Sequence, residues 1–249
     1  MNWKNIEKSI LQNGHVETLV PHFIRKVPGV NYIRERVLTE DCDFLDLDWL
    51  FSSNRENLVI LSHGLEGSSD QQYIKGMAKY FHSRGYDILA WNYRSCSGEL
   101  NYRSRFYHSG DINDLEFVIK HAIEKFDYKR IHLIGFSLGG NLTLRYLGGH
   151  DKKIYSQISS AACFSVPCDL ASGAKHLGKP ANTIYEQHFL LTLKKKLILK
   201  RKKGQVQTIN IKNALLAKNL IDFDHYVTAP LHGYRDAFDY YKKASSIFI

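Results

Sequence analysis

The stretch Ile131-His132-Leu133-Ile134-Gly135-Phe136-Ser137-Leu138-Gly139 is a short apolar run that ends in two glycines on either side of a serine. Residues 131–134 have the length and apolar character of a buried strand, and residues 141–147 favour a helix. Gly135 and Gly139 suit a turn so tight that side chains at these positions would collide with neighbouring backbone. The stretch therefore predicts a strand, a strained turn and a helix in immediate succession.

Short apolar runs of the same kind recur along the chain and alternate with helical patterns. The predicted strands are residues 58–61, 88–91, 131–134 and 158–166. One helical pattern runs from about residue 70 to residue 84, and another covers residues 111–126, where apolar side chains recur at the spacing of one helical face. This alternation is typical of a parallel α/β sheet.

Two regions depart from the alternation. Residues 32–39 and 43–51 are interpreted as an antiparallel hairpin, because apolar side chains alternate along the second segment as in a half-buried strand. Residues 167–228 are basic, favour helices and contain no clear buried strand, which predicts an inserted cap. We expect one domain over residues 1–249, with a mostly parallel sheet, an N-terminal hairpin at its edge and a helical cap.

Composition narrows the class of protein. Hydrophobic residues make up 44% of the 249 residues and charged residues 24%, which is typical of an ordinary folded chain. No run approaches the ~18 apolar residues of a spanning helix, and no apolar core of a secretory signal is present. The four cysteines form no CxxC pair and no zinc-ligand spacing with histidines. We expect a reduced, cytoplasmic protein without a metal.

The pattern Gly-x-Ser-x-Gly around Ser137 is typical of a nucleophilic serine when a buried strand precedes it and a helix follows. The helix dipole would favour negative charge that develops beside this serine. We interpret Ser137 as the nucleophile; the alternative is a tight turn with an incidental serine. The backbone N–H groups of Leu65, in the glycine-rich loop 63–69, and of Leu138 would form the oxyanion hole. His63 is interpreted as a brace for that loop.

Seven short motifs in a fixed order resemble the YheT-type α/β hydrolases, the AB-hydrolase 4 family. They are His63-Gly-Leu-Glu-Gly-Ser-Ser69, Asn92-Tyr-Arg-Ser-Cys-Ser-Gly-Glu99, Tyr107-His-Ser-Gly110, Gly135-Phe-Ser-Leu-Gly-Gly-Asn141, Ser165-Val-Pro-Cys-Asp-Leu170, Phe223-Asp224 and His232-Gly-Tyr-Arg-Asp-Ala237. The resemblance implies the α/β-hydrolase fold and hydrolysis of carboxylic esters with short to medium acyl chains, lipid-derived esters included. It also implies a Ser–Asp–His triad and no cofactor.

The resemblance also implies a catalytic Asp and His on two further strands, which would follow the helix near Tyr240. This chain ends at residues 245–249, where the first of those strands should begin. We therefore expect a truncated fold without its last strands and with no residue at the matching acid and base positions. The alternative to an esterase is a catalytically inactive remnant or a binding protein.

Other residues could stand in for the missing acid and base. The histidines after Ser137 are His150, His176, His188, His225 and His232. His150 would lie on the wrong side of the sheet, and His176 and His188 fall in the cap. His225 and His232 could approach the serine only if the cap folds down over it. The alternative for each is a polar histidine of the cap or of a loop. Asp169 follows the strand after the nucleophile helix and is interpreted either as the acid or as a helix N-cap.

The net charge of +9 is concentrated in residues 167–228, which hold eleven Lys/Arg and four Asp/Glu. In residues 194–203, basic side chains flank an apolar run. This segment suits weak contact with an anionic membrane surface, or a solvated cap helix whose apolar side covers the cleft. No recognisable nucleic-acid-binding module accompanies the charge, so we expect no nucleic-acid partner.

The loop after the strand at residues 88–91 carries Tyr93, Arg94 and Glu99. Its place at the carboxyl ends of the strands suits contact with substrate. A buried Arg94–Glu99 pair that holds the loop is the alternative.

Overall fold

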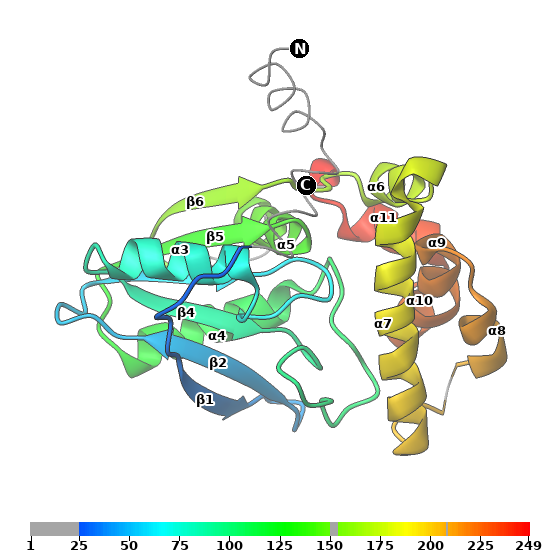
Figure 1. The fold of residues 1–249 in the computed structure, drawn as a ribbon, viewed down its shortest axis with the longest axis horizontal. Coiled ribbons are helices and arrows are strands. Elements are labelled where there is room, and N and C mark those ends of the chain that lie inside the picture. Colours follow the sequence, from blue (N-terminus) through cyan, green and yellow to red (C-terminus); the bar gives the residue numbers. More distant parts are fainter. Residues whose placement is uncertain (1–24, 150–153, 208) are drawn as a thin grey trace, which may run out of the picture.

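The structure, a computed structural model, describes residues 25–149, 154–207 and 209–249. Six strands form one sheet in the order β1-β2-β4-β3-β5-β6 (Figure 1). They are β1 (Ile33–Leu38), β2 (Phe44–Leu50), β3 (Asn57–Ser62), β4 (Asp87–Asn92), β5 (Arg130–Phe136) and β6 (Ile158–Phe164). The pairs β1–β2 and β2–β4 are antiparallel, whereas β3–β4, β3–β5 and β5–β6 are parallel. The predicted parallel sheet with an antiparallel N-terminal hairpin is confirmed.

The inner strand β3 is covered on both faces. Leu58 and Ile60 pack in an apolar cluster with α4 and α5, and Val59 and Leu61 pack with α3 on the opposite face. All four side chains are 0% exposed, as expected of an apolar run in a parallel sheet. The three helices are α3 (Gln72–His82), α4 (Ile112–Lys125) and α5 (Leu138–Gly148).

The strand β2 is buried on both faces, although its alternating pattern predicts a half-buried strand. Its polar residues Asp46 and Asp48 are each 1% exposed. Arg36 of β1 binds Asp46 through two N–H groups, at 2.7 and 2.8 Å, and Arg34 binds Asp48 in the same way and at the same distances. Because each carboxylate receives a guanidinium from the neighbouring strand, the polar face of β2 can leave the solvent.

The strand β6 forms the other edge of the sheet and pairs only with β5. Residues 159–162 are exposed, and the Phe164 side chain is 41% exposed. The apolar run at residues 158–166 is therefore a strand, as predicted, but an exposed edge strand.

Residues 167–228, here called the cap segment, contain helices and, in the part that the structure describes, no strand. They lie beside the sheet, with the long helix α7 next to α9 (Figure 1). Leu190 and Leu197 of α7 join a cluster of buried apolar side chains that includes Phe106. None of the described helices has the length and apolar character needed to span a bilayer. The helices from here to the end of the chain are α6 (Leu170–Leu177), η1 (Pro180–Asn182), α7 (Thr183–Lys202), α8 (Ile211–Leu216), α9 (Leu220–Phe223), the π-helical turn η2 (Asp224–Thr228), α10 (Ala229–Leu231), α11 (Ala237–Ala244) and η3 (Ser246–Phe248).

The last residues form the 3₁₀ turn η3 in place of the predicted beginning of a strand. The Ser246 N–H donates to Asn141 Oδ1 at 2.9 Å, and the Ile247 N–H donates to the Cys168 carbonyl at 3.1 Å. The Ser246 N–H is thus bound by α5, and the Ile247 N–H is bound by the loop after β6. Asn141 also donates to the Ala244 carbonyl at 2.8 Å, so α5 fixes the end of α11 as well.

Candidate active site

Ser137 lies at a sharp turn between β5 and α5. Its φ of 51° and ψ of −116° are strained for a residue with a side chain. A Cβ atom at Gly135 would come within 2.4 Å of the Gly139 carbonyl oxygen, and one at Gly139 within 2.5 Å of the Ser62 carbonyl oxygen. The turn is therefore as tight as the two glycines predict.

The loop after β3 passes close to this turn. A Cβ atom at Gly64 would lie 3.3 Å from Ser137 Cβ. Leu65, the next residue, and Leu138, at the first position of α5, both line the cavity that contains Ser137. The two predicted oxyanion donors and the serine are thus brought to one place by β3 and β5, which are adjacent parallel strands.

The N–H groups of this loop differ in their partners. The Gly64 N–H donates to the Tyr73 hydroxyl at 3.0 Å, and the Glu66 N–H donates to the Tyr107 hydroxyl at 2.7 Å. Neither the Leu65 N–H nor the Leu138 N–H donates a hydrogen bond to a residue that the structure describes. Both N–H groups thus lack an acceptor within residues 25–149, 154–207 and 209–249.

His63 lies under the loop and is 0% exposed. Its Nδ1 lies 2.8 Å from the Gly64 carbonyl oxygen, and its Nε2 accepts the Tyr93 N–H at 3.3 Å. Burial lowers the pKa of His63 to about 3, so the ring is neutral at physiological pH. These contacts fit a brace for the loop, as the sequence predicts for this histidine.

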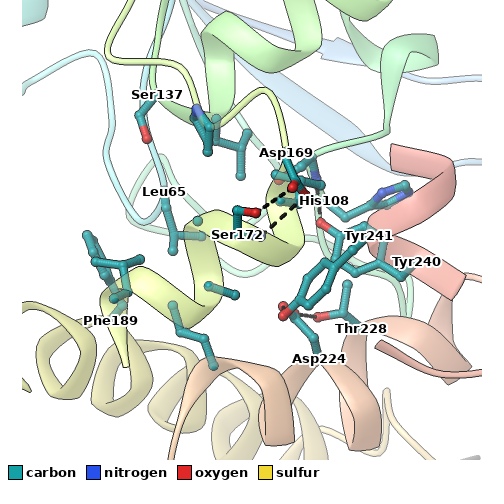
Figure 2. Close-up of a pocket in the computed structure, with 18 of the residues that line it drawn as sticks. Leu65, His108, Ser137, Asp169, Ser172, Phe189, Asp224, Thr228, Tyr240 and Tyr241 are labelled. Carbon is teal, nitrogen blue, oxygen red and sulfur yellow. Dashed lines mark hydrogen bonds between the residues drawn. The ribbon is translucent and has the colours of Figure 1, made fainter. Parts of the chain in front are cut away.

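A cavity of about 580 Å³ begins at Ser137 and extends between the sheet and the cap segment (Figure 2). Its volume falls within the range of small-molecule sites. Much of its wall is apolar, and both the loops of the sheet and the cap segment contribute side chains to it. These apolar residues include Leu65, Val166, Leu170, Leu177, Phe189, Leu193 and Leu220.

The cavity also has a polar region, at which Asp224 lies (Figure 2). Its carboxylate accepts hydrogen bonds from Thr228 Oγ1 at 2.5 Å and from the Tyr241 hydroxyl at 2.7 Å. Burial raises the pKa of Asp224 to about 6, although both hydroxyls oppose the shift. The sequence indicated Asp224 only as half of a two-residue motif, without a role.

Asp169 is the N-cap of α6. Its carboxylate accepts the N–H groups of Ala171 and Ser172 at the beginning of α6, at 3.0 and 3.3 Å. The Ser172 hydroxyl, at 2.5 Å, lowers the pKa of Asp169. Of the two interpretations left open by the sequence, the N-cap is the one that these contacts support.

No described histidine or carboxylate hydrogen-bonds to Ser137 Oγ. His150 lies outside the described residues, and His188 and His225 are exposed. His176 lines the cavity but is also exposed.

His232 packs against His108. The ring centroids of His232 and His108 are 4.2 Å apart, and Nε2 of His232 has no partner among the described residues. His108 lines the cavity, but its ring is turned away from Ser137 toward α11 (Figure 2). Burial lowers the pKa of His108 to about 3 and that of His232 to about 2. In the sequence, the motif at residues 107–110 is the one feature that points to His108.

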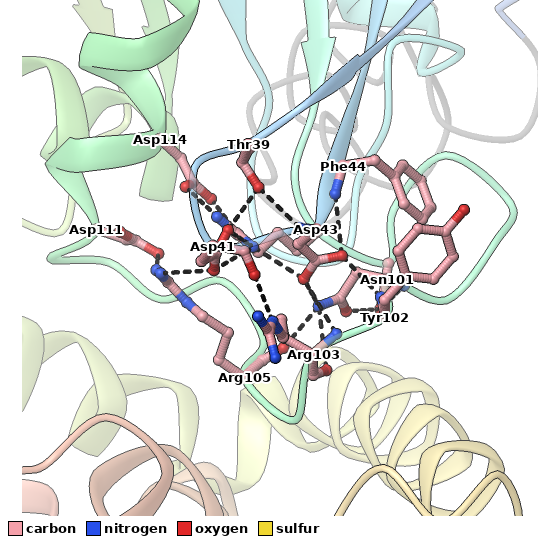
Figure 3. Close-up of polar contacts among 12 residues, drawn as sticks. Thr39, Asp41, Asp43, Phe44, Asn101, Tyr102, Arg103, Arg105, Asp111 and Asp114 are labelled. Carbon is pink, nitrogen blue, oxygen red and sulfur yellow. Dashed lines mark hydrogen bonds and ion pairs between the residues drawn. The ribbon is translucent and has the colours of Figure 1, made fainter.

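Arg94 does not form the predicted pair with Glu99. It binds Asp114 at 2.7 Å, Asp43 at 2.9 Å and Asp41 at 3.0 Å. Figure 3 shows these three aspartates close together. Glu99 is exposed and pairs with Arg36 at 3.0 Å. The buried ion pair that holds the loop exists, but its acidic partners are aspartates.

Tyr93 is also structural. It is 1% exposed, and its hydroxyl donates to the His63 carbonyl at 2.6 Å. Neither Tyr93, Arg94 nor Glu99 lines the cavity at Ser137. The interpretation of these residues as substrate contacts is not supported.

The basic segment 194–203 is only partly solvated. Lys194 Nζ donates to the Ala217 carbonyl at 2.5 Å, and Lys196 Nζ donates to Glu66 Oε1 at 2.8 Å. Lys200 is 0% exposed and contacts the Asn101 carbonyl at 3.5 Å. Three of its basic side chains therefore turn inward, so the predicted solvated cap helix has ammonium groups as well as apolar side chains on its inner side.

The fold and the turn at Ser137 define an α/β hydrolase, and a family model for the alpha/beta hydrolase fold matches residues 57–191. The chain belongs to the YheT-type α/β hydrolases. It is 30% identical over 241 residues to the esterase YheT of Escherichia coli (strain K12), covering 94% of this chain and 70% of that protein.

The chain is also similar to a phospholipase and to a solved esterase structure. The chain is 31% identical over 237 residues to phospholipase ABHD3 of Bos taurus, with 92% of this chain and 57% of that protein covered. It thus spans little more than half the length of this relative. The solved structure of the Pyrococcus furiosus esterase Pf2001 superposes with a TM-score of 0.50 and 25% identity, covering 59% of this chain and 58% of that one.

Proposed function

We propose that this chain is a hydrolase of carboxylic esters in which Ser137 is the nucleophile. The observation that carries the proposal is the placement of Ser137 on a strained turn beside two N–H groups without a described acceptor. Relatives named as an esterase and a phospholipase support ester hydrolysis by this family.

In this mechanism, Ser137 Oγ attacks the ester carbonyl carbon and the carbonyl oxygen becomes an oxyanion. The N–H groups of Leu65 and Leu138 donate to that oxyanion, and loss of one such donor typically costs about 10²–10³ in rate. The oxyanion intermediate collapses as the C–O bond to the alcohol breaks, and the alcohol leaves with the proton that Ser137 Oγ gave up. Water then hydrolyses the acyl-enzyme, which releases the carboxylic acid and returns the proton to Ser137 Oγ. A serine hydroxyl needs a general base to become a good nucleophile, and no described residue acts as one at hydrogen-bond distance.

The cavity suits esters with short to medium acyl chains. Its apolar wall would hold the acyl chain, and Asp224, Thr228 and Tyr241 offer polar atoms to an alcohol group. A lipid-derived ester has both parts. The relative named as a phospholipase supports this class of substrate.

A second candidate is a binding protein that holds the acyl ligand without turnover. The observation that favours it is the absence of any described imidazole or carboxylate bonded to Ser137 Oγ. The same cavity of about 580 Å³ would then be a ligand site.

We also propose that α7 contacts an anionic membrane surface through one outer stripe. Ile184, Leu191 and Ile198 are 71%, 66% and 39% exposed. Lys195 and Lys202 are exposed and share the face, since the spacings of 7, 4, 3 and 4 residues keep all five on one side of a helix. Apolar side chains between ammonium groups fit anionic lipid. Pelleting with phosphatidylglycerol vesicles should exceed pelleting with phosphatidylcholine vesicles. Changing both Lys195 and Lys202 to Glu should abolish the difference, because the difference depends on the ammonium groups.

The experiment that separates the two candidates compares the wild-type chain with Ser137→Ala. For an esterase, hydrolysis of p-nitrophenyl butyrate and labelling by a fluorophosphonate both occur, and Ser137→Ala lowers turnover at least about 10³-fold. Ser172→Ala removes another serine of the cavity wall and should retain turnover. For a binding protein, turnover and labelling are absent but a fluorescent fatty acid binds. Absence of all three would contradict both candidates.

A further inference from the structure

One ion pair joins the described part of the cap segment to the rest of the chain. Lys196 Nζ of α7 donates to Glu66 Oε1 at 2.8 Å. The Glu66 side chain is only 3% exposed and that of Lys196 18% exposed, so the pair is largely shielded from water and salt. This contact links the cap to the residue that follows the predicted oxyanion donor, Leu65.

The Glu66 carboxylate and backbone are both fixed. The same Oε1 atom accepts the Tyr107 hydroxyl at 2.8 Å, and the Tyr107 hydroxyl oxygen in turn accepts the Glu66 N–H at 2.7 Å. Glu66 adopts a φ of +55°, which is costly for a residue with a side chain. A strained backbone of this kind persists only where surrounding contacts hold it. Lys196 supplies the one charged contact that Glu66 makes in the described part of the chain.

Lys196 is itself held in place. Its Nζ lies 3.3 Å from Cys96 Sγ and 5.8 Å from the centre of the Tyr107 ring. The interactions with Glu66 and Cys96 outweigh the desolvation of the ammonium and raise the pKa of Lys196. The side chain is therefore charged throughout the neutral range.

In the next turn of α7, a second lysine, which is fully buried, contacts a loop outside the cap segment. Lys200 lies four residues after Lys196, on the same face of the helix. Its Nζ donates to the carbonyls of Arg103 and Arg105, the latter at 3.2 Å. The cap is thus attached to two loops, the one that carries Leu65 and the one that carries Tyr107.

We propose that Lys196 is a positioning residue, which holds Glu66 and thereby keeps the Leu65 N–H directed at the oxyanion beside Ser137. The oxyanion hole then forms only when the cap packs against the loop at residues 63–69. This inference rests on the proposed esterase function. It adds that the cap contributes to the rate of the chemical step as well as to the shape of the acyl site.

The test compares Lys196→Met, Lys196→Arg and the control Lys212→Met, which removes an exposed lysine of α8 in the same cap segment. Lys196→Met should lower kcat about 10- to 100-fold and leave KM within about 3-fold, because a misplaced donor weakens only the transition state. Lys196→Arg should restore most of kcat. Lys212→Met should match the wild type.

A second readout needs no catalysis. Amide hydrogen exchange in residues 63–69 should rise about 10-fold in Lys196→Met and remain unchanged in Lys212→Met. Glu66→Gln should mimic Lys196→Met, and the double variant should be no worse than either single variant, because both remove the same contact.

The inference is overturned if Lys196→Met leaves the exchange of residues 63–69 unchanged, or if the loop loosens without a loss of kcat. If the wild type neither turns over esters nor reacts with a fluorophosphonate, the proposed function fails. The exchange measurement then still decides whether Lys196 holds the loop.

Discussion

The inner strand β3 of the sheet and the helix α7 of the cap segment both exclude water, but they do so with different side chains. In β3, the residues from Leu58 to Leu61 are entirely buried and entirely apolar. In α7, Lys200 is equally buried, and its ammonium group is bound by backbone carbonyls of a loop from the other part of the chain. Apolar burial tolerates small shifts, whereas an ammonium among carbonyls requires its partners at hydrogen-bond distance. We therefore expect β3 and the turn beside it to respond to changes in volume, and α7 to respond to changes in charge.

The largest effect is expected at the turn that belongs to the sheet. Gly139→Ala would place a Cβ atom 2.5 Å from the Ser62 carbonyl oxygen and 2.7 Å from that of His63. Backbone atoms in a packed turn cannot yield that much, so we expect a loss of at least about 3 kcal/mol and of at least about 10² in ester turnover. Urea denaturation and p-nitrophenyl butyrate hydrolysis measure the two.

The matched change in the cap is Gly178→Ala. Its Cβ atom would meet nothing closer than 3.6 Å, and its φ of −70° suits any residue. Unfolding free energy and turnover should remain close to those of the wild type. Equal losses at the two glycines would contradict the distinction between the regions.

The second effect tests a charge that belongs to the sheet side. Arg94→Met leaves Asp43 and Asp114 without their guanidinium, and both carboxylates are buried. An uncompensated buried charge costs about 3–5 kcal/mol. We expect a loss of that size in the free energy of unfolding by urea. A loss below about 1 kcal/mol would show that water reaches these aspartates once Arg94 is removed.

The contrast between the regions also explains what the sequence could predict. The sequence predicts the strand at residues 58–61 and the turn at Ser137, because an apolar run and a pair of glycines are local signals. The three aspartates around Arg94 lie 20, 51 and 53 positions away along the chain. Pairing over such distances leaves no periodic pattern. For the same reason, the sequence indicated a basic segment at 194–203 but not which of its lysines turn inward.

The third effect concerns the buried ammonium of the cap. Burial lowers the pKa of Lys200 from 10.5 to about 8. Between those values the unfolded chain binds more protons at this residue than the folded chain, so stability rises with pH across the window. Relative to Lys200→Met, the wild type should gain on the order of 2–3 kcal/mol between pH 8 and pH 10.5. Urea denaturation of both proteins at each pH gives the difference, and a constant difference would mean that the ammonium is solvated.

The smallest effect is expected at Glu99, which lies on the sheet side but in the solvent. Its carboxylate is 3.0 Å from Arg36 Nη1, and the two side chains are 64% and 34% exposed. Arg36 keeps its bidentate contact with Asp46 when Glu99 is changed. Since exposed ion pairs contribute little, Glu99→Gln should leave the Tm and the kcat of ester hydrolysis unchanged. Differential scanning calorimetry and steady-state kinetics check both values. A marked fall in kcat with an unchanged Tm would mean that Glu99 touches the substrate after all, and that the loop after β4 moves toward the cavity when an ester binds.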